Sequence, residues 1–371
     1  MKILEPVKFR NLELKNRIAW TPAVTCLADD SGNVTNELID RHVKRARSGV
    51  GLIQVEACGV SDRKSPKLLR IYDDSFIEGH SRLTDAIHAY GAKCSIQLIH
   101  FVKQSVRTGW KHDVADLTLE EIDEIKRQFI EAAVRSKKAG YDAVELHCAH
   151  GYTLASFLSL LNKRTDAYGR NMEGRCKLAA DIIRGIREEV GPDYCIAARI
   201  NGEEFIKGGN TLSQSAEIAR CLCEAGLDLL SVSAGGKTED GPWYTGYSGE
   251  RTMPTANYPQ GCNLYLAEGI RRVASRYGVP VIGAGRIMTL AYGEQVFQEG
   301  KADIIGYCRP MLCDPNWLTK EIEGRQDEIV PCRYCNNCQA RDRRFEAVNC
   351  IFWEKYCERK GIDPYEPLYI G

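Results

Sequence analysis

Short apolar runs alternate with longer amphipathic segments along most of the chain, and this alternation constrains the fold more than any other feature. Mostly apolar runs of four to eight residues are typical of parallel strands buried on both faces. These runs are Ile18–Pro22, Gly51–Glu56, Lys93–His100, Ala143–His147, Tyr194–Ile200, Leu229–Ser233, Val279–Ala284 and Ile304–Cys308. Segments with helical periodicity separate most of them: Asn36–Arg47, Phe76–Tyr90, Leu119–Ala139, Glu173–Val190, Leu212–Ala225, Asn263–Tyr277 and Leu290–Gln298.

Eight strands that alternate with helices predict an α/β fold of the (β/α)8 type, a TIM barrel. The alternative is a doubly wound open sheet, which usually carries a glycine-rich dinucleotide loop early in the chain. No such loop is present in this sequence. We expect the barrel to span residues 1–328 and residues 329–371 to form a cysteine-rich segment packed on it.

Charge and hydropathy exclude several classes of partner. Lys and Arg together number 50, as do Asp and Glu, so the formal net charge is zero. The chain therefore has no basic field that would recruit nucleic acid or anionic lipid. The N-terminus lacks the apolar stretch of a signal peptide, and no run of about 18 apolar residues indicates a membrane span. These features predict a cytoplasmic protein.

Four of the sixteen cysteines gather near the C-terminus, at Cys332, Cys335, Cys338 and Cys350. Two, two and eleven residues separate them in turn. Four thiolates spaced in this way suit an iron–sulfur cluster or a tetrahedral zinc ion. Most of the other cysteines lie in apolar runs and are expected to be reduced, buried thiols, because the chain carries no export signal.

In a TIM barrel the chemistry takes place on the loops that follow the strands. Polar residues directly after the predicted strands are therefore candidates for a site: Glu56, Gln97, His100, His147, His150, Arg199, Ser233, Arg286 and Arg309. The longest loop, Ala234–Gln260, contains the aromatic residues Trp243, Tyr244, Tyr247 and Tyr258. A loop of that length with several aromatic residues favours a functional role.

The run Glu145-Leu-His147-Cys-Ala-His150-Gly-Tyr152 is the most informative internal motif. Two imidazole donors can polarise a substrate carbonyl, and a nearby phenol can supply a proton. A zinc-binding histidine pair is the weaker interpretation, because no third ligand follows at a metal-binding spacing.

Together with the histidine run and the four cysteines, three stretches carry a resemblance to a known family. They are Leu14-Lys-Asn-Arg-Ile18 leading into Pro22, Gly49-Val-Gly-Leu-Ile-Gln-Val-Glu-Ala57, and Ala302 to Pro315 with Cys308-Arg309-Pro310 at its centre. The chain resembles the Old Yellow Enzyme superfamily of NADH:flavin oxidoreductases. The similarity is to its iron–sulfur branch, which contains 2,4-dienoyl-CoA reductase, 2-enoate reductase and trimethylamine dehydrogenase.

The resemblance implies FMN as the cofactor and assigns its contacts residue by residue. Pro22, Ala23 and Val24 would lie beside the isoalloxazine ring, with Gly59 and Gln97 at its polar edge and Arg199 near its N1–O2 region. Gly285, Arg286 and Arg309 would hold the phosphate, with Cys308 in the same stretch. The loops after the seventh and eighth strands are also where TIM barrels generally bind phosphate.

The resemblance further implies the catalytic roles and the metal. His147 and His150 would hold the activating oxygen of the substrate, and Tyr152 would deliver a proton. Cys332, Cys335, Cys338 and Cys350 would bind a 4Fe–4S cluster. The chain carries no Gly-x-Gly-x-x-Gly fingerprint of the FAD- and NAD(P)H-binding half found in the large family members.

We therefore expect an ene-reductase that transfers a hydride from reduced FMN to the C=C bond of an α,β-unsaturated carbonyl or enoate substrate. A separate electron donor, either ferredoxin or an FAD-containing subunit, is expected; direct reduction by NAD(P)H, with a structural cluster, is the alternative. The sequence leaves open the substrate's identity and whether the chain forms a homo-oligomer.

Two other functions remain open. An oxidative amine dehydrogenase or demethylase is favoured by the two-residue gap in the second cysteine pair and by the aromatic loop, which could surround an ammonium group. It is disfavoured at His147, where the amine enzymes carry a tyrosine, and at Val24, where they carry a flavin-linked cysteine. A zinc-stabilised barrel acting as a lyase or binding module is the non-redox alternative.

Overall fold

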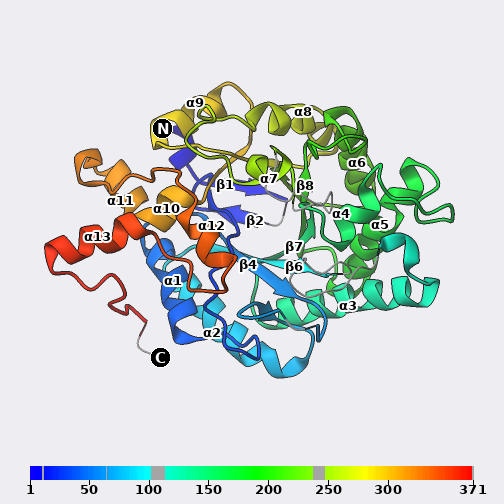
Figure 1. Cartoon of the computed structure of the whole chain (residues 1–371), viewed down its shortest axis with the longest axis horizontal. Helices are drawn as coiled ribbons and strands as arrows, with labels where there is room; N and C mark the ends of the chain where they lie inside the picture. The colour runs from blue at the N-terminus through cyan, green and yellow to red at the C-terminus, as the bar shows by residue number, and fades with distance from the viewer. Residues whose placement is uncertain (11, 64, 102–112, 237–246, 370–371) are drawn as a thin grey trace.

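Eight parallel strands close into a barrel around the core of the molecule (Figure 1). The computed structural model describes residues 1–10, 12–63, 65–101, 113–236 and 247–369. The strands are β3 (Ile18–Trp20), β4 (Leu52–Gly59), β6 (Lys93–Ile99), β7 (Ala143–Cys148), β8 (Cys195–Asn201), β9 (Leu229–Ser233), β10 (Val281–Ala284) and β11 (Ile304–Tyr307). Because β3 pairs with both β4 and β11, the sheet has no break, and the predicted TIM barrel is confirmed.

Helices cover the outside of the barrel and follow the strands in turn. They are α1 (Asn36–Arg47), α2 (Ile77–His88), α3 (Leu119–Lys138), α5 (Met172–Val190), α6 (Leu212–Glu224), α8 (Leu264–Ala274) and α9 (Leu290–Gln298). Side chains that accept backbone N–H groups fix the starts of several helices. At α3 the hydroxyl of Thr118 accepts the N–H of Glu121, and the carboxylate of Glu121 accepts the N–H of Thr118, which completes a capping box. Each predicted helix is present, with its ends within three residues of the prediction.

Aspartates that precede three of the strands fasten neighbouring strands together. In each case the carboxylate accepts the backbone N–H of a residue on or beside the preceding strand, at 2.9 to 3.0 Å. The bonds join Asp142 to Cys94, Asp228 to Ile196 and Asp303 to Val281. A charge-assisted bond of this kind fixes the register at the N-terminal end of the strands.

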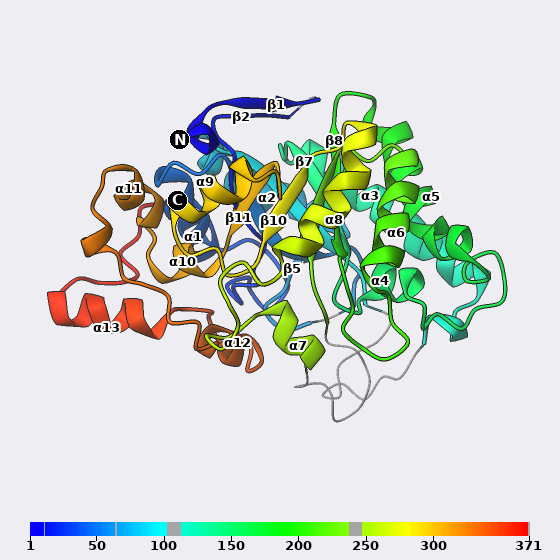
Figure 2. The same ribbon diagram turned by 90° about the horizontal axis from the view of Figure 1, so that it is seen from above.

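A hairpin made of β1 (Val7–Phe9) and β2 (Leu12–Leu14) covers the N-terminal end of the barrel. Leu12 and Leu14 pack against Leu52, Leu229 and Ile304 at the starts of barrel strands. Figure 2 shows this hairpin on the opposite side of the barrel from α7 (Tyr247–Thr252) and α12 (Asn337–Asp342). A ligand therefore has to enter from the C-terminal ends of the strands.

The C-terminal segment runs beside the barrel and contacts it at several points (Figure 1). It follows α10 (Arg309–Cys313) and α11 (Trp317–Ile322) and contains α12 and α13 (Ile351–Lys360). The backbone N–H of Val348 donates to the carbonyl of Thr25 at 2.8 Å, and Arg41 donates to the carbonyl of Val348 at 2.7 Å. These bonds tie the segment to the loop that follows β3 and to α1.

Shorter elements complete the fold: β5 (Leu69–Arg70), α4 (Thr153–Leu158) and single 3-10 turns at Lys2–Leu4, Asp74–Phe76, Val114–Asp116, Ser275–Tyr277 and Gln326–Glu328. In the described part of the chain, none of the helices combines the length and the apolar character that crossing a membrane requires.

Candidate active site

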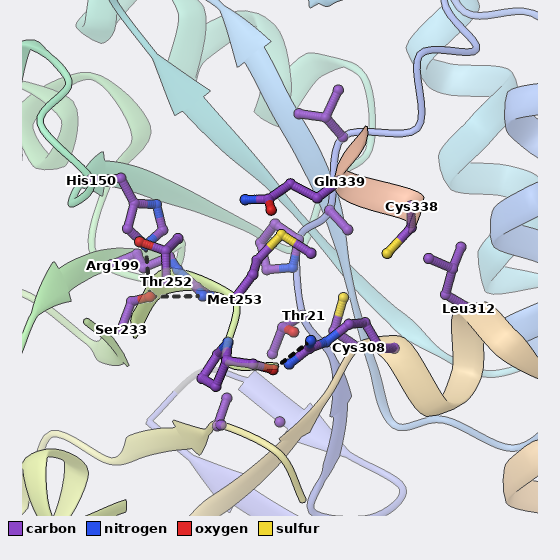
Figure 3. A pocket seen from close by; sticks show the side chains of 18 of the residues that line it. Thr21, His150, Arg199, Ser233, Thr252, Met253, Cys308, Leu312, Cys338 and Gln339 are labelled. Atoms are coloured by element: carbon purple, nitrogen blue, oxygen red, sulfur yellow. Dashed lines mark hydrogen bonds between the residues drawn. The ribbon is translucent and has the colours of Figure 1, made fainter. Parts of the chain in front are cut away.

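A cavity of about 220 Å³ lies at the C-terminal ends of the strands (Figure 3). The three predicted catalytic residues line it, as do nine of the ten predicted cofactor-binding residues. They are His147, His150 and Tyr152, together with Pro22, Ala23, Val24, Gln97, Arg199, Gly285, Arg286, Cys308 and Arg309. The barrel thus brings together side chains that are up to 287 residues apart in sequence (22 to 309).

Gly59 is the exception, because it does not line this cavity. The register of β4 against β6 shifts between Val55 and Ala57, and Ala57 lines the cavity instead. The carbonyl of Gly59 accepts the N–H of Ile71 at 3.0 Å, in the pairing of β4 with β5. Gly59 therefore lies outside the residues that the structure brings together at the cavity, and its contact with the flavin edge stays a prediction.

His147, His150 and Tyr152 form one aromatic group on the wall of the cavity. The ring centroids of the two histidines are 5.0 Å apart and nearly perpendicular, and the ring of Tyr152 lies 4.8 Å from that of His147. The N–H of Ala149 donates to Nδ1 of His147 at 3.4 Å, which places the proton of the neutral ring on Nε2. His147 can therefore act as a hydrogen-bond donor without carrying a charge.

Ser233 connects His150 to Arg199, a role that its position after a strand did not indicate. Its Oγ lies 2.7 Å from Nε2 of His150 and accepts from Arg199 at 3.3 Å (Figure 3). Because the guanidinium always donates, the serine proton is available to Nε2 of His150, and the tautomer of His150 with its proton on Nδ1 would accept it.

A buried polar network below the cavity fixes the orientation of Gln97 and Arg199. Gln97 and Gln54 each donate an amide N–H to Glu145 at 2.7 Å. Burial raises the pKa of Glu145, and the charge of Arg199 and the two amides act against that shift. Because the amide nitrogen of Gln97 is bonded to Glu145, its amide oxygen is the acceptor that remains for a ligand in the cavity. Arg199 supplies hydrogen-bond donors to the same ligand. A flavin edge, with one N–H between two carbonyls, fits this pair.

Two arginines and one tyrosine form a positively charged corner of the cavity. The guanidinium groups of Arg286 and Arg309 lie 4.6 and 4.5 Å from the ring centroid of Tyr334. Arg286 donates to the carbonyl of Ala256, and Arg309 donates to the carbonyl of Pro254. Because these acceptors are neutral, the charge of both arginines is available to an anion such as a phosphate.

Backbone geometry supports the same corner. Gly285 has φ +128° and Arg286 has φ +54°. A Cβ at position 285 would approach the side chain of Asn263 to 3.0 Å, in a conformation that residues other than glycine avoid. The sharp turn after β10 thus requires Gly285 and presents Arg286 at the cavity.

The four cysteines of the C-terminal motif line a second, smaller hollow beside the cavity. Cys338 lines both spaces and therefore stands in the wall between them. Figure 3 shows Cys338 and Leu312 on the side of the cavity opposite His150 and Ser233. Cys335 is exposed, whereas the other three cysteines are partly buried.

The sulfurs of the four cysteines do not lie at the spacing of a bound zinc ion. Four thiolates around zinc at about 2.3 Å place their sulfurs about 3.8 Å apart. Among the described residues, no group of three or more of these cysteines has its sulfurs all within 4.8 Å of one another.

A fifth thiol lies next to this hollow. Sγ of Cys313, which is completely buried at the end of α10, lies 3.4 Å from Sγ of Cys350. This hydrogen bond lowers the pKa of the Cys350 thiol. A thiol of low pKa is readily available as a thiolate ligand.

Several other candidates from the sequence have structural roles or cannot be placed. His100 is buried and bonds Oγ1 of Thr153 at 3.0 Å, and burial lowers its pKa to about 3. Glu56 is buried and accepts the N–H of Thr25 at 3.1 Å, so it supports the loop after β3. Trp243 and Tyr244, and the side chain of Tyr247, lie outside the described residues.

Sequence reasoning missed the residues that later segments contribute to the cavity: Thr252, Met253, Pro254, Tyr334, Gln339 and Asp342. Most of them carry no motif and reach the cavity only through the fold. Two signals were available: the long loop Ala234–Gln260, which contains Thr252, Met253 and Pro254, and Tyr334, an aromatic residue between two of the clustered cysteines.

Comparison with known proteins identifies the family of the chain. The sequence model of the NADH:flavin oxidoreductase / NADH oxidase family matches residues 2–116 and 103–328. The chain is 39% identical to an NADH oxidase of Thermoanaerobacter brockii over 88% of its length and 51% of the relative. It is 30% identical to a cinnamate reductase of Clostridium sporogenes over 94% of its length and 57% of the relative. The chain therefore spans about half the length of these curated relatives.

Two solved structures share the fold with a TM-score of 0.83 each. One is a 2-naphthoyl-CoA reductase in complex with 2-naphthoyl-CoA, which is 27% identical and matches 95% of this chain and 56% of that one. The other is a histamine dehydrogenase from Rhizobium sp. 4-9, which is 26% identical and matches 95% of this chain and 53% of that one.

Proposed function

The chain belongs to the NADH:flavin oxidoreductase / NADH oxidase family and is a flavin-dependent oxidoreductase; from this premise we propose that it is an FMN- and iron–sulfur-dependent ene-reductase. The observation that carries the proposal is the group of His147, His150 and Tyr152 in a cavity whose wall also contains the cluster cysteine Cys338. When bound, FMN exchanges a hydride with the substrate, and a 4Fe–4S cluster exchanges single electrons with FMN.

The imidazoles bind and activate the substrate. His147 and His150 lie on one wall at a ring separation of 5.0 Å, and both can donate to a single carbonyl or carboxylate oxygen. Negative charge that develops on this oxygen during reduction of the C=C bond is stabilised by the two donors. The serine–arginine link at His150 holds its ring in place for this role.

Tyr152 supplies the proton. Its ring packs edge-on against Phe101, with centroids 5.4 Å apart, and beside His147. These contacts hold the phenol next to the bound carbonyl, so that its hydroxyl can protonate the α-carbon while the hydride reaches the β-carbon. Similarity to a cinnamate reductase supports an enoate or a related unsaturated carbonyl compound as the substrate class.

We further propose that residues 1–328 form the flavin-binding barrel and that residues 329–371 form the cluster-binding segment. Exposed Cys335 would bring one edge of the cluster to the molecular surface. A redox protein such as ferredoxin, or an FAD-containing protein or domain, could then deliver electrons there. Direct reduction of FMN by NAD(P)H is the competing route.

Oxidative amine chemistry is the second candidate, because the chain shares its fold and 26% identity with a histamine dehydrogenase. Anaerobic stopped-flow spectroscopy separates the two candidates. We expect the reduced protein to be reoxidised rapidly by cinnamate or an enone, and the oxidised protein to keep its flavin absorbance when mixed with a tertiary amine or histamine. If an amine bleaches the flavin absorbance of the oxidised protein and an enone does not reoxidise the reduced protein, the second candidate is correct.

A further inference from the structure

Tyr334 lies between two cysteines of the predicted cluster and at the same time reaches the corner of the cavity that suits a phosphate. It is 3% exposed and lines both the cavity and the cysteine-lined hollow. Its backbone has φ +52°, a conformation that favours glycine. A bulky residue kept in such a conformation at a metal-binding loop points to a role for its side chain.

The ring of Tyr334 contacts the guanidinium groups of two arginines. The guanidinium groups of Arg286 and Arg309 each stack on it, at 4.6 and 4.5 Å from its centroid. Cation–π contacts of this kind are strongest when they are shielded from water. Two positive charges on one ring repel each other, so an anion bound between or beside them would relieve the repulsion.

The hydroxyl of Tyr334 is buried and has no hydrogen-bond partner within the described part of the chain. Buried polar groups are almost always bonded, because an unpaired group loses its hydration without compensation. Within the same described residues, no ion pair gives Arg286 or Arg309 a carboxylate partner, so a phenol O–H beside them would find its acceptor on a bound anion.

We propose that Tyr334 donates its hydroxyl proton in a hydrogen bond to the phosphate of the bound flavin, and that this contact couples binding of the flavin to binding of the iron–sulfur cluster. The inference rests on the proposed function, since it requires both groups. It adds a binding residue and a dependence of one cofactor on the other.

Coupling follows from the position of Tyr334 within the cysteine loop. Cys332 and Cys335 flank it, so a cluster held by both would fix the loop that carries the phenol. Asn336 extends the connection, because it donates to the carbonyl of Met253 at 2.7 Å and accepts from Arg309 at 2.8 Å. If the cluster strengthens binding of the flavin, the flavin must strengthen binding of the cluster by the same factor.

A double-mutant cycle tests the proposal on the full-length protein: the unchanged chain, Tyr334→Phe, Cys335→Ala and the double variant. Release of FMN on dilution, measured by flavin fluorescence, gives the dissociation constant, and iron analysis reports the cluster. We expect Tyr334→Phe to weaken FMN binding about tenfold, as loss of one bond to a charged group would, with iron retained. Cys335→Ala should lose iron and also weaken FMN binding.

The double variant decides whether the two losses share a cause. We expect it to bind FMN about as weakly as the weaker of the single variants, because both changes remove the same contact. If the double variant raises the dissociation constant of FMN by the product of the two single effects, the coupling is wrong. If Tyr334→Phe binds FMN as tightly as the unchanged chain, the hydrogen bond is wrong. Tyr356→Phe, which loses a hydroxyl elsewhere in the same segment, should bind FMN as tightly as the unchanged chain.

A second measurement does not depend on affinity. The ³¹P NMR signal of bound FMN should shift between the unchanged protein and Tyr334→Phe, and an identical signal would count against the contact. Neither experiment uses a reducible substrate. The inference can therefore fail while the protein still reduces enones, and it can hold in a protein that oxidises amines.

Discussion

Replacing Tyr152 with phenylalanine tests the assignment of the proton donor. Phenylalanine keeps the ring that lies 4.8 Å from His147 and 5.4 Å from Phe101, so the packing of this wall is preserved. Only the hydroxyl is lost. The substitution therefore removes the proposed acid without opening a cavity and without disturbing the histidine pair.

The size of the effect follows from the role of the hydroxyl. A positioned general acid contributes about 10²- to 10⁴-fold to a rate, which corresponds to about 2.7 to 5.4 kcal/mol in the activation free energy. We expect reoxidation of the reduced protein by a saturating enone to slow at least about a hundredfold. Flavin content should not change, because the phenol has no role in holding the cofactor.

Anaerobic single-turnover stopped-flow, with the return of oxidised-flavin absorbance as the signal, measures this step directly. Tyr168→Phe is the matched control, because Tyr168 belongs to the same stretch of sequence but is buried against Phe157, with ring centroids 6.2 Å apart. If Tyr152→Phe reacts within about threefold of the unchanged protein, the proton comes from another group, and the assignment of Tyr152 is wrong.

Three further predictions concern groups around the cavity. Burial raises the pKa of Glu56 from 4.5 to about 7, so its favourable contribution to folding is complete below pH 4.5 and is lost as the pH rises through 7. In urea titrations the unchanged chain should lose about 3 kcal/mol of unfolding free energy relative to Glu56→Gln between pH 4.5 and 8. A difference between the two proteins that stays constant with pH would contradict the burial argument. Arg309→Ala should release FMN at protein concentrations at which the unchanged chain keeps it bound, and Arg309→Lys should be intermediate. Full retention of FMN by the alanine variant would exclude a phosphate contact. Ser233→Ala should shift the pH dependence of enone reduction by freeing the ring of His150, whereas an unaltered profile would mean that the serine only fills space.

The barrel was predictable because buried parallel strands appear in the sequence as continuous apolar runs. The run Leu229–Ser233 coincides with β9, and the predicted and observed bounds of α1 and α9 are identical. The hairpin of β1 and β2 was not predicted, because strands of three residues are too short for an alternating pattern to be distinguished.

Site residues that directly follow a barrel strand could be predicted from the sequence. Site residues in segments that reach the cavity only after the C-terminal segment has docked could not. His147 and Arg199 are neighbours because β7 and β8 pair at that register. Gly59 does not line the cavity, because the register of β4 against β6 shifts between Val55 and Ala57, a bulge that no local pattern in the sequence announces. The contact of Tyr334 with Arg286 depends on how the C-terminal segment docks, and no local pattern in the sequence specifies that.

The central proposal is a flavin that lies beside paired histidines with an iron–sulfur cluster across the wall of its cavity. An anaerobic reductive titration with dithionite, followed by absorbance and electron paramagnetic resonance, counts the electrons that one chain accepts. We expect two electrons for the flavin and one for the cluster. An end point after the two flavin electrons, without a cluster signal, would contradict the iron–sulfur assignment of the four cysteines, and a chain that accepts no electrons would contradict the proposal as a whole.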